Sequence, residues 1–107
     1  MSRITIPPIL KGVKQNVPFD FSSLLAIGET LSTEVVTATV YSGTDATPSN
    51  IISGAASASG AIVTQLIDTT GANGVVGVLY ELLAAVTTSA GQTLHLSGYL
   101  VVMPDLP

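Results

Sequence analysis

The sequence predicts an all-β protein: a single antiparallel β-sandwich of about seven strands, preceded by an extended N-terminal arm. Short stretches in which apolar and polar residues alternate recur along the chain, and several are rich in β-branched residues. Turn-forming residues separate these stretches at intervals of roughly 8–12 residues. No convincing long amphipathic helix interrupts them, so the pattern does not indicate a parallel sheet covered by helices.

The length and composition are consistent with one domain. The chain has 107 residues, of which 47% are hydrophobic, so it is long enough to bury a single core. Only 9% of the residues are charged, compared with about 25% in a typical soluble domain. Because few ions must lose water when a partner approaches, this surface favours a protein that works in contact with its neighbours.

Residues 1–10 are predicted to form the arm, and residues 11–107 the sandwich. Pro7 and Pro8 exclude a helix interior or a central strand, and both favour an extended path. Two alternatives stay open for this arm: it lies along a neighbouring subunit, or it is a loose terminus. The candidate residues for contact between subunits are Arg3, Ile4, Ile6, Pro7 and Pro8.

The clearest predicted strand covers residues 31–41. Val36, Ala38 and Val40 share one face there, and β-branched residues dominate the stretch. A single helical turn is expected at residues 22–25, before Gly28. The other predicted strands are 11–21, with Pro18 at an edge or a bulge, 61–67, 78–88 and 93–103.

Two stretches allow more than one interpretation. Residues 54–61 are almost all Gly, Ala and Ser, so they form either a thin edge strand or a loop. Residues 78–88 also fit a helical stripe, but glycines precede them and a turn follows directly, which favours a strand. The residues that point inward from that strand are Tyr80, Leu82, Ala84 and Val86.

Charge and cysteine content argue against several function classes. Lys and Arg total three and the net charge is −4, so the chain lacks the basic patch that binds nucleic acid or anionic lipid. The absence of cysteine excludes disulfides and thiolate chemistry and fits a reducing cytosol. The N-terminus shows no secretory signal, and the longest apolar run, 74–86, contains Glu81 and is too short to span a membrane.

No constellation of residues predicts catalysis, a cofactor or a metal. His95 is the single histidine, and no Gly-x-Ser-x-Gly motif accompanies it, so a structural or solvent-facing role is expected. The acidic residues are scattered, with no spacing typical of a calcium loop. Asp45 and Asp68 are expected to cap turns through nearby backbone amides. The chain is therefore expected not to be an enzyme.

The segment 77–93 carries the most specific local pattern. A Tyr-x-Leu-x-Ala-x-Val strand begins at Tyr80, and a glycine-containing turn and an alternating final strand follow it. This pattern resembles the last two strands of immunoglobulin-like sandwiches. The resemblance implies that the Tyr80 ring fills the core while its hydroxyl bonds to nearby backbone. The chain lacks the cysteine pair and core tryptophan of antibody domains, which favours a bacterial or viral type.

Six short motifs are spread over residues 10–103. They are Val-Pro-Phe-Asp-Phe at 17–21, Gly-Glu-Thr-Leu-Ser at 28–32, Val-Tyr-Ser-Gly-Thr-Asp at 40–45, Ser-Gly at 53–54, Val-Thr-Gln at 63–65 and Thr-Leu-His-Leu-Ser-Gly-Tyr-Leu at 93–100. Together they resemble a narrower family, the small virion proteins of tailed bacteriophages described as fibre–tail adaptors. The resemblance implies an immunoglobulin-like module in a symmetric ring on the tail or neck, linking tail fibres or spikes to the tube.

The expected partners are other virion proteins and further copies of the chain, with no nucleic acid and no membrane. The expected location is the virion, assembled in the cytoplasm of the bacterial host. Three alternatives stay open: a head-decoration protein, a carbohydrate- or receptor-binding module that uses Tyr99 or Tyr41 as its aromatic platform, and a hydrolase that uses His95 and a serine.

Overall fold

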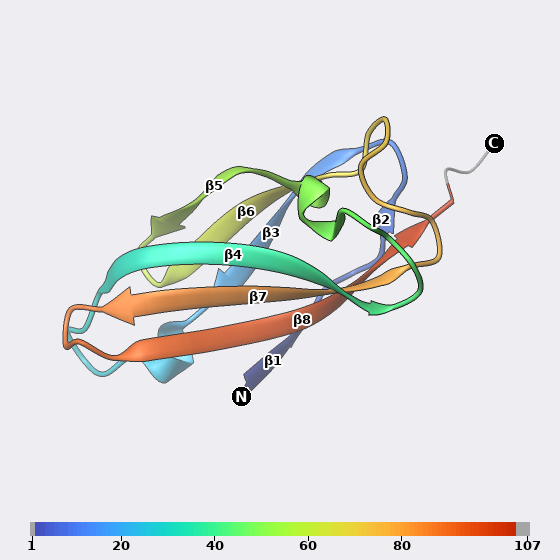
Figure 1. Ribbon diagram of the computed structural model, residues 1–107. Coiled ribbons are helices and arrows are strands. Elements are labelled where there is room, and N and C mark those ends of the chain that lie inside the picture. Colours follow the sequence, from blue (N-terminus) through green and yellow to red (C-terminus); the bar gives the residue numbers. More distant parts are fainter. Residues whose placement is uncertain (1, 105–107) are drawn as a thin grey trace.

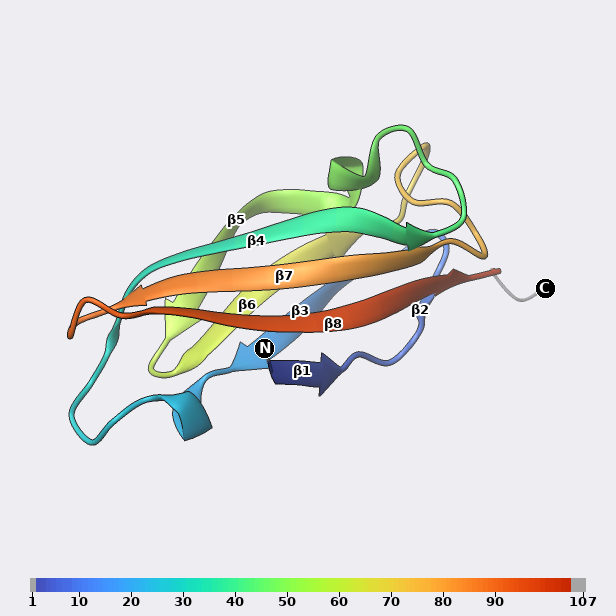
Figure 2. The same ribbon diagram turned by 60° about the horizontal axis from the view of Figure 1, so that its bottom comes forward.

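The computed structural model describes residues 2–104, which form two packed β-sheets (Figures 1 and 2). One sheet has the order β1 (Ser2–Thr5), β8 (Thr93–Met103), β7 (Leu79–Thr88) and β4 (Leu31–Ser42), and β2 (Ile9–Leu10) also pairs with β8. The other sheet has the order β3 (Lys14–Asp20), β6 (Ile62–Asp68) and β5 (Ile52–Ser59). The short 3-10 helices are η1 (Ser22–Leu24) and η2 (Pro48–Ile51). The all-β sandwich predicted from the sequence is therefore confirmed.

Burial alternates strictly along β7, which lies between β4 and β8 in the long ladder. Along β7 every second residue is buried, and the residues between them are half-buried. A pleated strand places alternate side chains on opposite faces, so one face enters the core. This confirms that residues 78–88 form a strand rather than a helix. The buried apolar residues of the core are Ile6, Ile9, Val17, Phe19, Phe21, Val36, Ala38, Ile51, Val63, Ile67, Val78, Tyr80, Leu82, Ala84, Val86, Leu96, Leu100 and Val102.

The small-residue stretch is an edge strand, one of the two alternatives left open by the sequence. Strand β5 lies at the end of its sheet, and its pairing with β6 shifts register between Ser53 and Ser57. Gly54 lies inside this irregularity with a φ of +71°, a conformation that glycine adopts without a steric penalty. The buried Gln65 side chain donates hydrogen bonds to the carbonyls of Ser53 and Gly54, each at 3.2 Å.

The N-terminal segment lies on its own chain, along β8. Strands β1 and β2 both run parallel to β8, so the five-stranded sheet is mixed rather than purely antiparallel as predicted. Pairing is interrupted between Thr5 and Ile9, where Pro7 and Pro8 have no N–H to donate. The next strand, β3, joins the opposite sheet. Between β2 and β3 the chain therefore crosses from the five-stranded sheet to the three-stranded sheet. The alternation of residues within single strands could not predict this crossing.

The expected helical turn at residues 22–25 is observed as η1. No α-helix occurs in the part of the chain that the structure describes, and no helix there is long and apolar enough to cross a membrane.

Candidate functional site

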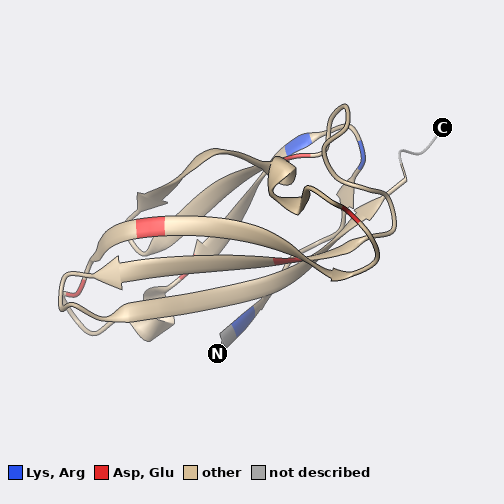
Figure 3. Ribbon diagram, in the orientation of Figure 1, with Lys and Arg blue, Asp and Glu red and all other residues tan. Residues whose placement is uncertain are grey.

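The outer face of the five-stranded sheet carries the most distinctive surface chemistry. Its side chains alternate with the buried ones of β4, β7, β8 and β1, and the strand register places them in rows. Charged residues are few on this sheet: Arg3 on β1, Glu34 on β4 and Glu81 on β7 (Figure 3). The rows of this outer face are Thr33–Thr87–Thr93, Val35–Ala85–His95, Thr37–Leu83–Ser97–Arg3, Thr39–Glu81–Tyr99–Thr5 and Leu79–Val101, with Tyr41 beside the last row.

Two tyrosines and an arginine lie together on this face and form what we call the aromatic cluster: Arg3, Tyr41 and Tyr99. The guanidinium carbon of Arg3 is 4.6 Å from the centroid of the Tyr99 ring, within the range of a cation–π contact. The Tyr99 and Tyr41 ring centroids are 4.5 Å apart with the planes tilted by 46°. Tyr41 is 61% exposed, so the cluster presents an open aromatic surface.

Strand pairing explains how the cluster forms. The parallel pairing of β1 with β8 sets Thr5 opposite Tyr99 and brings Arg3 onto the same face. Tyr41 lies at the register shift between Val40 and Ser42, and such irregularities redirect side chains at the end of a ladder. Sequence reasoning considered the tyrosines and the arm separately, because their proximity depends on where the arm docks.

The other arm residues named from the sequence divide between core and surface. Ile6 is 8% exposed, and a Cβ added to Gly98 would lie only 2.7 Å from its Cδ1 atom. Glycine at this position therefore makes room for Ile6, which is not available to a neighbouring subunit while the arm is docked. Ile4 is half-buried, whereas Pro7 and Pro8 are exposed.

Tyr80 joins two loops at one end of the sandwich. Its side chain is fully buried, its hydroxyl donates to Asp45 Oδ2 at 2.6 Å, and it accepts from the backbone N–H of Val75 at 2.8 Å. Asp45 Oδ1 also accepts from the N–H of Thr47 at 2.9 Å, the turn-capping role expected from the sequence. The same role is confirmed for Asp68, whose Oδ1 accepts from the backbone N–H of Thr70 at 2.8 Å.

These contacts change how the two groups ionise. Burial, followed by the hydrogen bond to Asp45, raises the pKa of Tyr80 to about 12. The hydrogen bond from Tyr80, followed by the bond from the Thr47 amide, lowers the pKa of Asp45 below its usual value of 3.8. The pair therefore consists of a neutral phenol that donates to a carboxylate over the whole physiological pH range.

Lys11 forms a second set of hydrogen bonds at this end, which was not predicted from the sequence. Its Nζ donates to the carbonyls of Gly71 at 2.9 Å, Asn73 at 2.7 Å and Gly74 at 3.0 Å. An ammonium has three donors, so these three carbonyls satisfy it completely. The only signal in the sequence was a lysine next to a Gly turn, which does not identify a distant loop as its partner.

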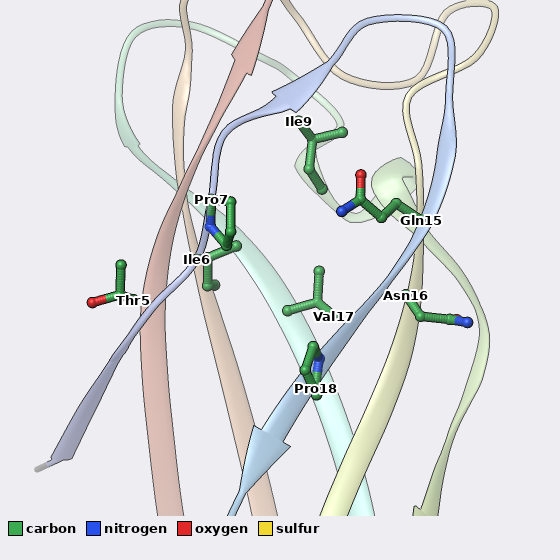
Figure 4. A pocket seen from close by; sticks show the side chains of 8 residues that line it. All are labelled: Thr5, Ile6, Pro7, Ile9, Gln15, Asn16, Val17 and Pro18. Carbon is green, nitrogen blue, oxygen red and sulfur yellow. The ribbon is translucent and has the colours of Figure 1, made fainter.

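A groove of about 220 Å³ lies between the arm and β3 (Figure 4). Its apolar part is formed by Ile6, Ile9 and Val17, which are core residues. The Gln15 side chain points from β3 toward Ile9, whereas Thr5 and Asn16 point away from the groove (Figure 4). Pro7 and Pro18 complete the lining. The groove follows β3, and none of its lining residues carries a titratable side chain.

His95 is exposed on the outer face, in register with Ala85. Within residues 2–104, no group of three or more His, Cys, Asp or Glu side chains is placed to hold a metal ion.

Comparison with known proteins adds no assignment, since no model of a known protein family and no curated protein matches the chain.

Proposed function

We propose that the sandwich is of the immunoglobulin-like type. Strand order supports this, because β3, β6 and β5 form one sheet while β4, β7 and β8 form the other, as in the seven-stranded members of that fold. The Tyr80 hydroxyl accepts from a backbone N–H five residues upstream, as the corner tyrosine of such sandwiches does. The departure is β1, which pairs in parallel with β8 and makes that sheet mixed.

We further propose that the chain is a structural protein of a bacteriophage virion: an adaptor that links tail fibres or spikes to the tail or neck through protein–protein contacts, without catalysis. The motif resemblance supports the family. The observation that carries the binding role is the aromatic cluster on a weakly charged sheet face, with Tyr41 61% exposed and Arg3 already held against Tyr99. Tyrosine and arginine are the residues most enriched at the energetic centres of protein interfaces.

Analysis of purified virions tests this proposal directly. Mass spectrometry is expected to find the chain at a fixed copy number relative to the tail proteins, and electron cryomicroscopy is expected to place it at the tail or neck. A virion without the chain would refute the proposal. Density on the capsid instead would replace it with the head-decoration alternative.

The cluster is tested by two variants on the same face. Tyr41→Ala removes the exposed ring and is expected to reduce incorporation into virions at least tenfold, since truncating an interface anchor typically costs about 2 kcal/mol or more. His95→Ala, on the same face but outside the cluster, is expected to incorporate normally. Equal incorporation of both variants would rule out the aromatic cluster as the contact.

The exposure of Tyr41 also favours a second candidate, a carbohydrate- or receptor-binding module. An exposed ring offers an apolar face on which a sugar ring can stack, and Glu81 is paired in register with Tyr99 beside it. A glycan array distinguishes the candidates. Binding that is lost in Tyr41→Ala but kept in His95→Ala supports this one, and no binding on the array supports the adaptor.

A further inference from the structure

Among the described residues 2–104, no strand pairs with the outer edge of β3. Hydrogen bonds at both ends of the β3–β6 ladder show which residues of β3 bond to β6. Thr69 N–H donates to the carbonyl of Val13, and Phe21 N–H donates to the carbonyl of Ala61, each at 2.9 Å. The register between these ends has no shift. Because bonded positions alternate in an antiparallel pair, the odd-numbered residues of β3 direct their backbone groups to β6.

The even-numbered residues of β3 consequently point their backbone groups away from the sheet. Lys14, Asn16 and Asp20 each present an N–H and a carbonyl there, while Pro18 presents only a carbonyl. No backbone group of these residues bonds to another segment within residues 2–104. Such an edge is a template on which another strand can add.

The groove leaves this edge accessible. Figure 4 shows the arm, with Pro7 and Ile6, on one side of the groove and β3, with Val17 and Pro18, on the other. The arm follows β8 and not β3. No other strand therefore occupies the position beside β3 in the described part of the chain.

We propose that the occupant of this edge is the β3 strand of a second copy of the chain, paired antiparallel across a two-fold axis at Val17. In this register Lys14 of each copy faces Asp20 of the other, which gives two cross-strand ion pairs on the exposed face by symmetry. Asn16 of each copy faces Pro18 of the other, and its N–H donates to the proline carbonyl. A two-fold interface is self-complementary and closes as a dimer.

Charge and the proline together select this register. A shift by two residues in one direction places the two Pro18 residues opposite each other, where neither can donate. A shift in the other direction sets Lys14 opposite Pro18 and removes both ion pairs. Opposite charges directly across an antiparallel pair are favourable, whereas like charges are unfavourable. The inference is independent of the proposed virion function, because it uses only the edge and its charges.

Mixing two charge-reversed variants tests the dimer. Lys14→Glu alone and Asp20→Lys alone each bring like charges together and are expected to weaken dimerisation roughly tenfold at low ionic strength. In the mixture both cross-strand pairs are again opposite in charge, so native mass spectrometry is expected to show a heterodimer of the two variants. Thermal unfolding of each variant checks that the monomer is intact.

A pair of substitutions at Asn16 tests the backbone contact. Asn16→Pro removes the outward N–H and is expected to abolish the dimer, while Asn16→Ala keeps the N–H and is expected to dimerise like the unmodified chain. Sedimentation measures both. The proposal is overturned by an unmodified chain that stays monomeric up to about 1 mM, a concentration that would detect even weak association. A dimer insensitive to Asn16→Pro, or a mixture without heterodimers, also overturns it.

Discussion

The two ends of the sandwich differ in how their loops are held (Figure 1). At one end, buried or half-buried side chains bond to segments that are distant in sequence: Thr69 donates to the Leu10 carbonyl, Lys11 to the Asn73 carbonyl and Tyr80 to the Asp45 carboxylate. At the other end, the segment 25–30 and the turn 89–92 are joined by exposed groups: Thr30 N–H donates to Ser89 Oγ at 3.0 Å, and Ser89 N–H donates to the Thr30 carbonyl at 2.8 Å. The buried Thr88 hydroxyl also donates to the half-buried Glu29 there. Ile27 there is fully exposed.

The difference indicates that the burial of the bonded groups, rather than the number of hydrogen bonds, decides how firmly a loop is held. A polar group buried with its partners is costly to leave unpaired, whereas an exposed one exchanges its partner for water. We therefore expect substitutions at the Tyr80 end to lower stability strongly and those at the Ile27 end to have little effect. The following predictions test that contrast in order of decreasing effect.

The largest effect is expected for Tyr80→Ala. Removing a fully buried aromatic ring leaves a cavity between the sheets and should lower the free energy of unfolding by about 3–5 kcal/mol. Urea denaturation followed by circular dichroism measures it. Tyr41→Ala is the matched control, because that ring is exposed. Equal losses in the two variants would contradict the structure.

Tyr80→Phe isolates the hydroxyl. The ring still fills the core, but the Val75 N–H and the Asp45 carboxylate lose a partner, so the expected loss is about 1–3 kcal/mol. Hydrogen exchange of the Val75 amide is expected to accelerate in this variant. An unchanged exchange rate would show that the hydroxyl does not hold this loop.

Lys11→Met tests the ammonium at the same end. Methionine retains much of the apolar stem but cannot donate to the carbonyls of the 71–74 loop, so we expect a loss of about 1–2 kcal/mol and faster proteolysis of that loop. Lys14→Met, which leaves the loop untouched, is the control. Equal proteolysis of the two variants would contradict the proposed tie.

The hydrogen bond between Tyr80 and Asp45 predicts how the stability of the protein changes at acidic pH. The pKa of Asp45 is lowered in the folded state, so its contribution is fully present above the unfolded value of 3.8 and disappears as the pH falls through the lower folded value. Asp45→Asn is therefore expected to reduce the loss of stability between about pH 4 and pH 2, as measured by unfolding at each pH. An acid profile identical to that of the unmodified chain would exclude this contribution.

The smallest effect is expected for Ile27→Ser at the opposite end. Because the side chain is fully exposed, the change in the free energy of unfolding should lie within about 0.5 kcal/mol. A larger destabilisation would mean that Ile27 packs against the protein and that this end is held as firmly as the other.

Much of the fold was predictable from local pattern. Alternation located β3, β4, β6, β7 and β8, and it was decisive for residues 78–88, where helix-forming residues compete with the alternation. It did not decide whether the small-residue stretch that forms β5 is a strand or a loop. The turn-capping roles of Asp45 and Asp68 were also predictable, since a carboxylate bonds to an amide two residues away. These features depend only on neighbouring residues.

The candidate sites were less predictable because they combine distant segments. Arg3 meets Tyr99 only through the parallel pairing of β1 with β8, and Lys11 meets a loop about sixty residues away. No pattern within the arm distinguishes docking on its own sheet from docking on a neighbour.

The sequence by itself determined the strands β3, β4, β6, β7 and β8, their inward faces and the sparse charge of the surface, because side-chain alternation and composition are local properties. The tertiary structure alone decided which edges stay unpaired, where the arm crosses between the layers, and which polar groups are buried. Those outcomes depend on how the two sheets share a single core and on which backbone groups find partners inside it.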